Sequence, residues 1–357
     1  MQQNILLTLI GGLLFTGFNG CYKASQKITE PNLVTSELAL LGQGKMNKAE
    51  AQFVVSNAAA NSLSYINADT RAVAATQTIP GSILYYIVYL PLKDKLFVTD
   101  QGHNSVQVID PASHTVDGSI PVGTAPMHMV GQKQQSKLWV VNNTSKSITE
   151  INANNLQVTH TLQLDYTPHD IAVNANGTKI YVSLNKAGTW YVNTYSTNNY
   201  NEVDSRGFGS NWLHLFYSQV NDRLYAADQG LGKFWSLDPD DLNSTSATSV
   251  AMPGAHGLTL SADEKYSYIA SMGTNMIYVY DNSTNTIISQ VTSTVSPNAH
   301  NVAVDQAHGI LLATHSGAAS TSVSSYAFNN NVLTQGSTIT VGTNPQGITY
   351  FIRKTKD

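Results

Sequence analysis

Histidine recurs in this chain at a nearly constant interval, and imidazole is a side chain well suited to binding a transition metal at neutral pH. The recurring positions lie 41 to 46 residues apart, each near the start of an apolar run. The residues beside each histidine differ between repeats, which indicates that the imidazole itself is needed. In seven repeats the residues at this position are Tyr86, His128, His169, His214, His256, His300 and Gln346, so that the first and the last are not histidine.

The segments around these positions are copies of one unit. Each copy has an apolar run, a polar turn and a second strand ending in small or polar residues, as in HDIAVNANGTKIYVSLNK from His169 to Lys186. Two further strand-like runs follow before the next copy, which makes four short strands per unit. A period of 40–45 residues with four strands is typical of the blades of a β-propeller.

The two ends of the repeat complete each other. The last unit supplies only a first strand, GITYFI from Gly347, and the first unit, which starts at Phe53, lacks one. Together they form one blade and leave no open sheet edge. The sequence therefore predicts an all-β fold, a seven-bladed propeller of four-stranded antiparallel blades closed by strands from both ends of the chain.

The second strands carry a family resemblance. IYVSLN (Ile180–Asn185), preceded by the turn NANGTK, resembles the repeat of YVTN-type propellers, which are named for a Tyr-Val-Thr-Asn strand end. The resemblance covers about residues 52–353. It implies the propeller fold, and it leaves the activity open because that family hosts very different functions.

In a propeller the first strand of each blade lines the axial channel, so we expect the repeated position to form one ring at one depth. Each histidine follows an inter-blade loop, which places the ring at the channel mouth on that face. A bound cation would hold crowded imidazoles neutral, and we predict a metal site formed by His128, His169, His214, His256 and His300. The alternative is that each imidazole only hydrogen-bonds loop carbonyls.

The choice of metal follows from the donors. No carboxylate occupies a ring position, which argues against Ca²⁺ and Mg²⁺. Thioethers lie close by at Met127, Met129 and Met252, although Met129 also suits core packing. We therefore expect copper, with zinc as second choice.

Other polar residues complete the predicted site. Tyr86 and Gln346 would form the pocket wall for a small-molecule substrate. Tyr86 is a candidate redox-active residue, and Asp170 a candidate general base or a partner that orients His169. His103 and His315, predicted at the ends of second strands on the same face, would contact substrate or remain solvated.

A histidine-lined channel in a seven-bladed propeller resembles two copper enzyme groups. Pro168-His169-Asp170 looks like the Pro-His-Asp stretch in the propeller of nitrous oxide reductases, and the methanethiol oxidase (selenium-binding) family is similar in outline. The reductase family also has a cupredoxin domain and seven ligating histidines. We find no cupredoxin domain in this sequence and at most five histidines, and so expect a mononuclear or dinuclear site.

The N-terminal segment suggests export. An apolar run from Ile5 to Gly20 has the length of a signal-peptide core. The end of this run with the next residue, Phe18-Asn19-Gly20-Cys21, resembles a bacterial lipobox, which implies lipidation of Cys21; the alternative is an ordinary cleaved signal peptide. We predict a signal peptide at 1–20, a lipidated tether at 21–51, a propeller at 52–353, and a location facing the periplasm or the cell surface.

Composition excludes several partners. The net charge is −4, without a Lys/Arg cluster, so we expect no nucleic acid partner. We expect a monomer that contacts membranes only through its lipid. No P-loop, nucleotide-binding glycine motif or G-x-S-x-G occurs. Three functions remain: a copper-dependent oxidoreductase, a non-catalytic binding or scaffold propeller, and a lactonase-type hydrolase, a family that favours carboxylate and Asn ligands.

Overall fold

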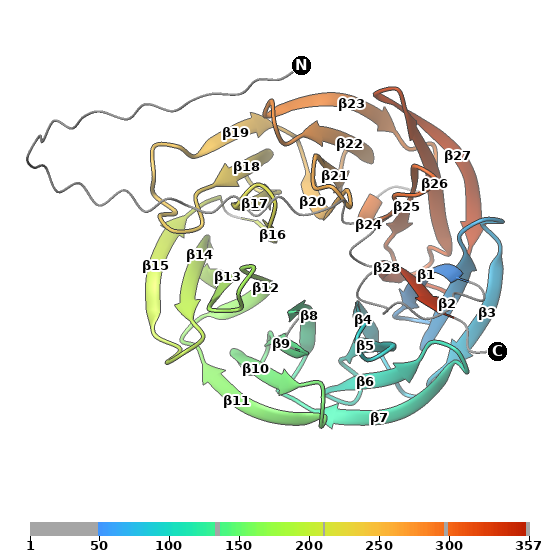
Figure 1. Cartoon of the computed structure of the whole chain (residues 1–357), viewed down its shortest axis with the longest axis horizontal. Helices are drawn as coiled ribbons and strands as arrows, with labels where there is room; N and C mark the ends of the chain where they lie inside the picture. The colour runs from blue at the N-terminus through green and yellow to red at the C-terminus, as the bar shows by residue number, and fades with distance from the viewer. Residues whose placement is uncertain (1–48, 133–135, 210, 296–298, 355–357) are drawn as a thin grey trace, which may run out of the picture. The chain divides into compact units, whose positions relative to one another are not determined.

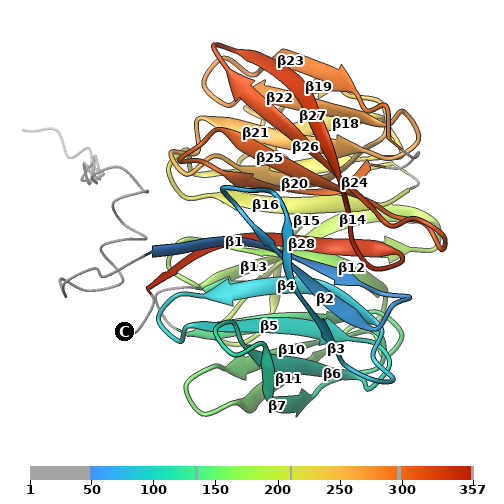
Figure 2. The same ribbon diagram turned by 90° about the vertical axis from the view of Figure 1, so that its right-hand side faces the viewer.

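The computed structural model describes residues 49–132, 136–209, 211–295 and 299–354. Within these ranges the regular secondary structure consists of β-strands, without helices. The strands form seven sheets of four, numbered here as blades 1 to 7. The blades stand around a common axis (Figure 1), and the side view shows neighbouring sheets fanned against one another (Figure 2). The predicted seven-bladed β-propeller is confirmed. The predicted signal peptide and Cys21 lie outside the described residues.

Blade 1 joins the two ends of the repeat region. Its strands, from the axis outward, are β28 (Pro345–Lys354), β1 (Ala49–Asn57), β2 (Ser62–Asn67) and β3 (Val73–Thr78). β28 pairs antiparallel with β1, with Phe53 opposite Tyr350. Arg353 reinforces this junction, because its guanidinium lies 3.0 Å from Glu50 of β1 and 3.3 Å from Asp94 of blade 2. The predicted closure by strands from both ends is confirmed.

The remaining blades follow chain order, from the axis outward. Blade 2 contains β4 (Leu84–Leu90), β5 (Lys95–Asp100), β6 (Ser105–Asp110) and β7 (Thr115–Pro121), and blade 3 contains β8 (Pro126–Gln132), β9 (Lys137–Asn142), β10 (Ser147–Asn152) and β11 (Gln157–Gln163). Blade 4 contains β12 (Thr167–Val173), β13 (Lys179–Lys186), β14 (Thr189–Ser196) and β15 (Glu202–Gly207).

The other three blades repeat this order. Blade 5 contains β16 (Leu213–Ser218), β17 (Arg223–Asp228), β18 (Lys233–Leu237) and β19 (Thr248–Ala251), and blade 6 contains β20 (Ala255–Leu260), β21 (Tyr266–Ser271), β22 (Met276–Asp281) and β23 (Thr286–Thr292). Blade 7 contains β24 (Ala299–Asp305), β25 (Ile310–His315), β26 (Ser322–Asn329) and β27 (Val332–Thr340).

The apolar core is divided among the blade interfaces. Each of seven clusters of buried side chains joins residues of two neighbouring blades, for example Phe97 of blade 2 with Val140 of blade 3. A second strand such as β13 is buried along most of its length because a blade covers each of its faces, whereas the outermost β11 is exposed. The interfaces thus fix the inner strands around the axis.

The described residues contain no helix long and apolar enough to cross a membrane.

Candidate metal centre

Six of the seven inner strands carry a β-bulge near the axis. In each bulge two inner-strand residues oppose one residue of the second strand; in β12, His169 and Asp170 lie between the pairs Pro168–Leu184 and Ile171–Val182. β16 lacks a bulge there, and His214 pairs directly with Ala227. The bulged residues are Tyr85–Tyr86, Met127–His128, His169–Asp170, His256–Gly257, His300–Asn301 and Gln346–Gly347.

The expectation that the ring residues share one register was wrong. His169, His256 and His300 are the first residues of their bulges, whereas His128 is the second residue of its bulge. A bulge re-aims side chains, so both of its positions can turn toward the axis. An alignment on apolar runs cannot distinguish them, because the inserted residue has no counterpart in a regular ladder.

Hydroxyl groups stabilise several bulges. The residue opposite the bulge accepts a hydrogen bond from the second bulged N–H, as Ser183 Oγ does from Asp170 at 2.9 Å and Thr99 Oγ1 from Tyr86 at 2.8 Å. Thr99 Oγ1 also donates to the Met127 carbonyl of the next blade at 2.7 Å. The bulges are therefore hydrogen-bonded parts of the fold that hold the ring side chains in place.

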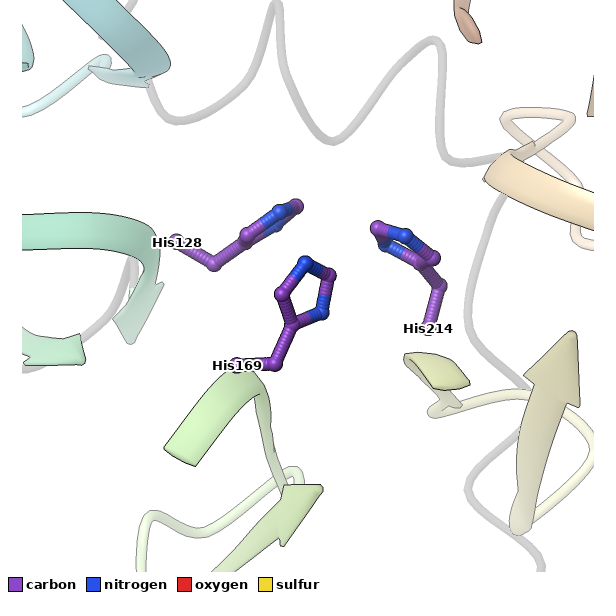
Figure 3. A group of neighbouring side chains, drawn as sticks. All are labelled: His128, His169 and His214. Carbon is purple, nitrogen blue, oxygen red and sulfur yellow. The ribbon is translucent and has the colours of Figure 1, made fainter. Parts of the chain in front are cut away.

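Three histidines meet at the axis. The ring centroids of His128, His169 and His214 lie 4.7 to 4.9 Å apart, and one nitrogen from each can be chosen so that all three lie within 4.8 Å of one another. Figure 3 shows the three imidazoles turned toward a common space from three neighbouring blades. Their side chains are only 2 to 3% exposed. We call His128, His169 and His214 the triad.

Asp170 links two members of the triad. Its Oδ1 lies 3.2 Å from Nδ1 of His128, and its Oδ2 lies 3.2 Å from Nδ1 of His214. The same oxygens accept hydrogen bonds from the N–H groups of Ile171 at 2.7 Å and Leu215 at 2.9 Å. The sequence suggested a partner for His169, but the carboxylate contacts the histidines of the two flanking blades instead.

Two ring nitrogens of the triad that do not face Asp170 are left for another partner. Nδ1 of His169 and Nε2 of His214 are buried and have no hydrogen-bond partner among the described residues. A buried polar atom without a partner costs about 1–3 kcal/mol, and a bound ion would remove that cost. Because Nδ1 of His214 faces Asp170, its Nε2 is the nitrogen available to a ligand.

The electrostatics of the site favour neutral imidazoles. Burial, together with the nearby His214 and His128, holds the pKa of His169 well below its usual value. Burial also lowers the pKa of His214, against the opposing effect of Asp170. For Asp170 burial alone would raise the pKa, but His128 and His214 outweigh it and the net shift is well downward. The site therefore combines one carboxylate with the imidazoles of His169 and His214, which carry free lone pairs at neutral pH.

His256 and His300 continue the ring but have protein partners. The His256 ring centroid is 3.9 Å from that of His214, and its Nδ1 lies 3.0 Å from Gln229 Oε1. Nδ1 of His300 accepts a hydrogen bond from the Asn301 amide at 2.9 Å. Burial lowers the pKa of His300 to about 3. These two histidines lie beside the triad, with the His300 ring centroid 4.8 Å from that of His256.

The other predicted wall residues flank the ring. The Tyr86 ring packs 4.7 Å from His128, and burial raises the pKa of its hydroxyl. The side-chain amide of Gln346 donates to Asn344 Oδ1, and the backbone carbonyl of Gln346 accepts from the Thr314 hydroxyl. Met129 and Met252 belong to apolar clusters between blades, so they pack in the core beside the site. Two of the three thioethers that favoured copper are thus accounted for by packing.

The two additional histidines have local partners. Nδ1 of His103 lies 2.7 Å from Asp100, and its side chain is 47% exposed. His315 is the last residue of β25 and is fully buried, with its Nε2 2.6 Å from Ser324 Oγ. The alternative that His315 remains solvated was wrong, because the residue is fully buried, and its contact with a substrate stays a prediction.

Sequence reasoning overlooked Trp212. Its indole packs on the His169 ring with centroids 4.4 Å apart, and it lies directly before β16. Buried Trp190 contacts both, at 5.7 Å from His169 and 5.3 Å from Trp212. Trp212 stands two residues before His214 in the sequence. That spacing was the available signal, since residues entering an inner strand lie beside the axis.

Comparisons with known proteins agree with the fold. A family model described as Arylesterase matches residues 243–339, about a quarter of the chain. No curated protein matches the sequence. Similar solved structures include a functionally unknown protein from Desulfotomaculum acetoxidans (12% identity, TM-score 0.67, covering 85% of this chain and 99% of that chain).

Two other similar structures are of named proteins. AztD from Citrobacter koseri is 13% identical, with a TM-score of 0.62 over 87% of this chain and 100% of that chain. Kuenenia stuttgartiensis hydrazine synthase is 16% identical, with a TM-score of 0.57 over 77% of this chain and 89% of that chain. At such identities the likeness shows the propeller fold alone.

Proposed function

We propose that this protein binds a transition metal ion through His128, His169 and His214. The observation that carries the proposal is the convergence of three buried imidazoles whose nitrogens lie within 4.8 Å of one another. Nδ1 of His169 and Nε2 of His214 lack a hydrogen-bond partner among the described residues. Asp170 adds a carboxylate that orients two of the rings, as outer carboxylates do for ligating histidines.

Copper is our first choice and zinc our second. Three imidazoles suit both ions, and a nitrogen site binds Cu²⁺ more tightly than Zn²⁺ when both are available. The export predicted from the N-terminal sequence also supports copper, whereas the packed methionines no longer do. We propose that the protein is an oxidoreductase acting on a small molecule, because three protein ligands leave a coordination position open.

A non-catalytic binding or scaffold propeller is the main alternative. Its support is that His256 and His300 already have protein partners, as imidazoles with a purely structural role would. An ester hydrolase is a further candidate because of the arylesterase family match. The matched segment contains His256 and His300 but none of the triad. The family match therefore gives no support to a metal site at the triad.

We further propose that the chain is an exported lipoprotein, attached through Cys21. The support is the apolar run followed by a lipobox-like segment. The YVTN-type repeat, which we propose as the family of these blades, is compatible with such a location.

Metal stoichiometry tests the proposal. Protein purified without a histidine tag would be stripped with a chelator, reconstituted separately with Cu²⁺ and Zn²⁺, and analysed by elemental mass spectrometry. We expect about one ion per chain, retained in His256→Ala, His300→Ala and the control His114→Ala, and lost in His169→Ala and His214→Ala. His114 is a suitable control because it lies in blade 2 and packs on Tyr65 of blade 1, whereas the triad comes from blades 3, 4 and 5.

The opposite result would leave the scaffold function. Substoichiometric binding of both ions by the folded wild type would contradict the metal proposal. So would full occupancy in His169→Ala and His214→Ala. Turnover of phenyl acetate by the metal-free protein would favour the hydrolase instead.

A further inference from the structure

Trp212 occupies a place between solvent and the triad. Its side chain is 38% exposed, whereas His169, on which it packs, is only 3% exposed. The two rings are 4.4 Å apart between centroids and tilted by 40°. Among the described aromatic residues that contact the triad, Trp212 alone is exposed, whereas Tyr85, Tyr86 and Trp190 are half-buried or buried.

The indole is held where it is by its surroundings. The Trp212 carbonyl accepts a hydrogen bond from the Gln229 N–H at 3.1 Å, and the next residue begins β16. On the side chain, Trp190 packs at 5.3 Å and is itself only 4% exposed. A half-exposed aromatic side chain with a fixed backbone and a buried ring beside it has few alternative positions.

We propose that Trp212 is the cover of the triad: it shields His169 from solvent, and a small molecule reaches the metal by passing the indole. The access of ligands to the ion rests on the proposed function, whereas the shielding of His169 does not. On this view Trp212 limits which exogenous ligands enter, and a small anion such as azide enters more readily than a bulky one.

Chemical labelling of the metal-free protein tests the cover. Diethylpyrocarbonate modifies neutral, accessible imidazoles, and peptide mass spectrometry gives the rate at each histidine. We expect Trp212→Ala to raise the rate at His169 about tenfold or more, because the wild type must first open locally. Trp212→Phe should stay near the wild-type rate, since a phenyl ring still covers the imidazole. His103 and His308, whose side chains are 47% and 55% exposed, provide internal references.

Tyr166→Ala provides the matched control. Tyr166 is a 42% exposed aromatic residue directly before β12, the strand that carries His169. Its substitution should leave the His169 rate unchanged. Circular dichroism would establish that each variant is folded, and Trp212→Leu would replace Trp212→Ala if the latter were not. Equal rates at His169 in the wild type and in the folded Ala or Leu variant would overturn the cover.

Azide binding to copper-loaded protein gives the second measurement. Stopped-flow absorption should show faster azide association in Trp212→Ala than in the wild type, with unchanged copper content. Unchanged association at full copper content would contradict the role in access. Failure of the wild-type protein to bind either copper or zinc would instead refute the proposed function, and the labelling rates would still decide whether Trp212 covers His169.

Discussion

Asp170 and His214 come from the inner strands of neighbouring blades, and Oδ2 of the carboxylate lies 3.2 Å from Nδ1 of the imidazole. The other oxygen makes the same approach to His128 from the opposite side. One buried side chain thus connects blades 3, 4 and 5 at the axis. This arrangement leaves Nε2 of His214 as the nitrogen available to a ligand.

Replacing this carboxylate should weaken the metal site. In Asp170→Asn an amide N–H would face an imidazole and a backbone N–H, where both oxygens now accept. We expect metal affinity to fall about 10–100-fold, as is usual for outer partners of ligating histidines. Competition titration with a chelating dye would measure it. Asp165→Asn, an exposed acid before the same strand, should bind metal like the wild type, and an unaltered affinity in Asp170→Asn would argue against orientation by the carboxylate.

Stability should depend on pH through the buried histidines. The pKa values of His169, His214, His256 and His300 are all lowered in the folded protein, first by burial. As pH falls below about 6.5, histidines of the unfolded chain bind protons that the folded protein excludes. The free energy of unfolding therefore decreases with falling pH, until the pH reaches the lowered pKa values of the folded protein. Each such histidine contributes a slope of about 1.4 kcal/mol per pH unit.

Urea unfolding of metal-free protein at pH 7.5, 6.5 and 5.5 measures this slope. The His256→Gln, His300→Gln double variant should show a shallower dependence. Asp170 does not interfere, because its lowered pKa affects stability only around and below pH 4. Exposed His308 acts in the opposite direction, since its hydrogen bond to Asp305 raises its pKa. A flat pH profile between 7.5 and 5.5 would contradict the burial of neutral imidazoles.

Truncation should destabilise the whole propeller. Deleting residues 342–357 removes β28, exposes the edge of β1, and removes Ile348 from the core between blades 7 and 1. We expect a large fall in the unfolding temperature and a broader transition, because ring closure is lost. Deleting residues 355–357 alone is the control. Cooperative unfolding of the longer truncation at the wild-type temperature would rule out a stabilising closure.

Cys21 should determine membrane attachment. We expect Cys21→Ala to move the protein from the membrane to the soluble fraction without changing its circular dichroism spectrum, because the propeller begins well after this residue. Cell fractionation followed by immunoblotting would measure this. A Cys21→Ala variant that stays with membranes would contradict lipidation at this position.

The fold could be predicted from the sequence because it is periodic. Blade number followed from the spacing of similar runs, and closure followed from the incomplete units beginning at Phe53 and ending with β28. Each of these predictions needs only the order of apolar runs along the chain, and a propeller places its blades in chain order.

The site could be predicted only in part. The five histidines are indeed on inner strands, but the contacts of Asp170 and Trp212 cross from one blade to another. Such contacts depend on the angle between blades and on bulges of one residue, which a hydropathy pattern does not record. The burial of His315, whose Nε2 contacts Ser324 of β26, was not foreseen either.

The bulges give this scaffold a way to change its chemistry without rebuilding its core. In six blades two adjacent residues share the stretch beside the axis, and in blade 5 a single one does. Gaining or losing one residue there exchanges the group presented to the channel, while the paired strands outside it keep their register. Each bulged stretch could therefore be redesigned independently of the core. Met127 and Tyr85 are positions at which a fourth metal-ligating side chain could be introduced.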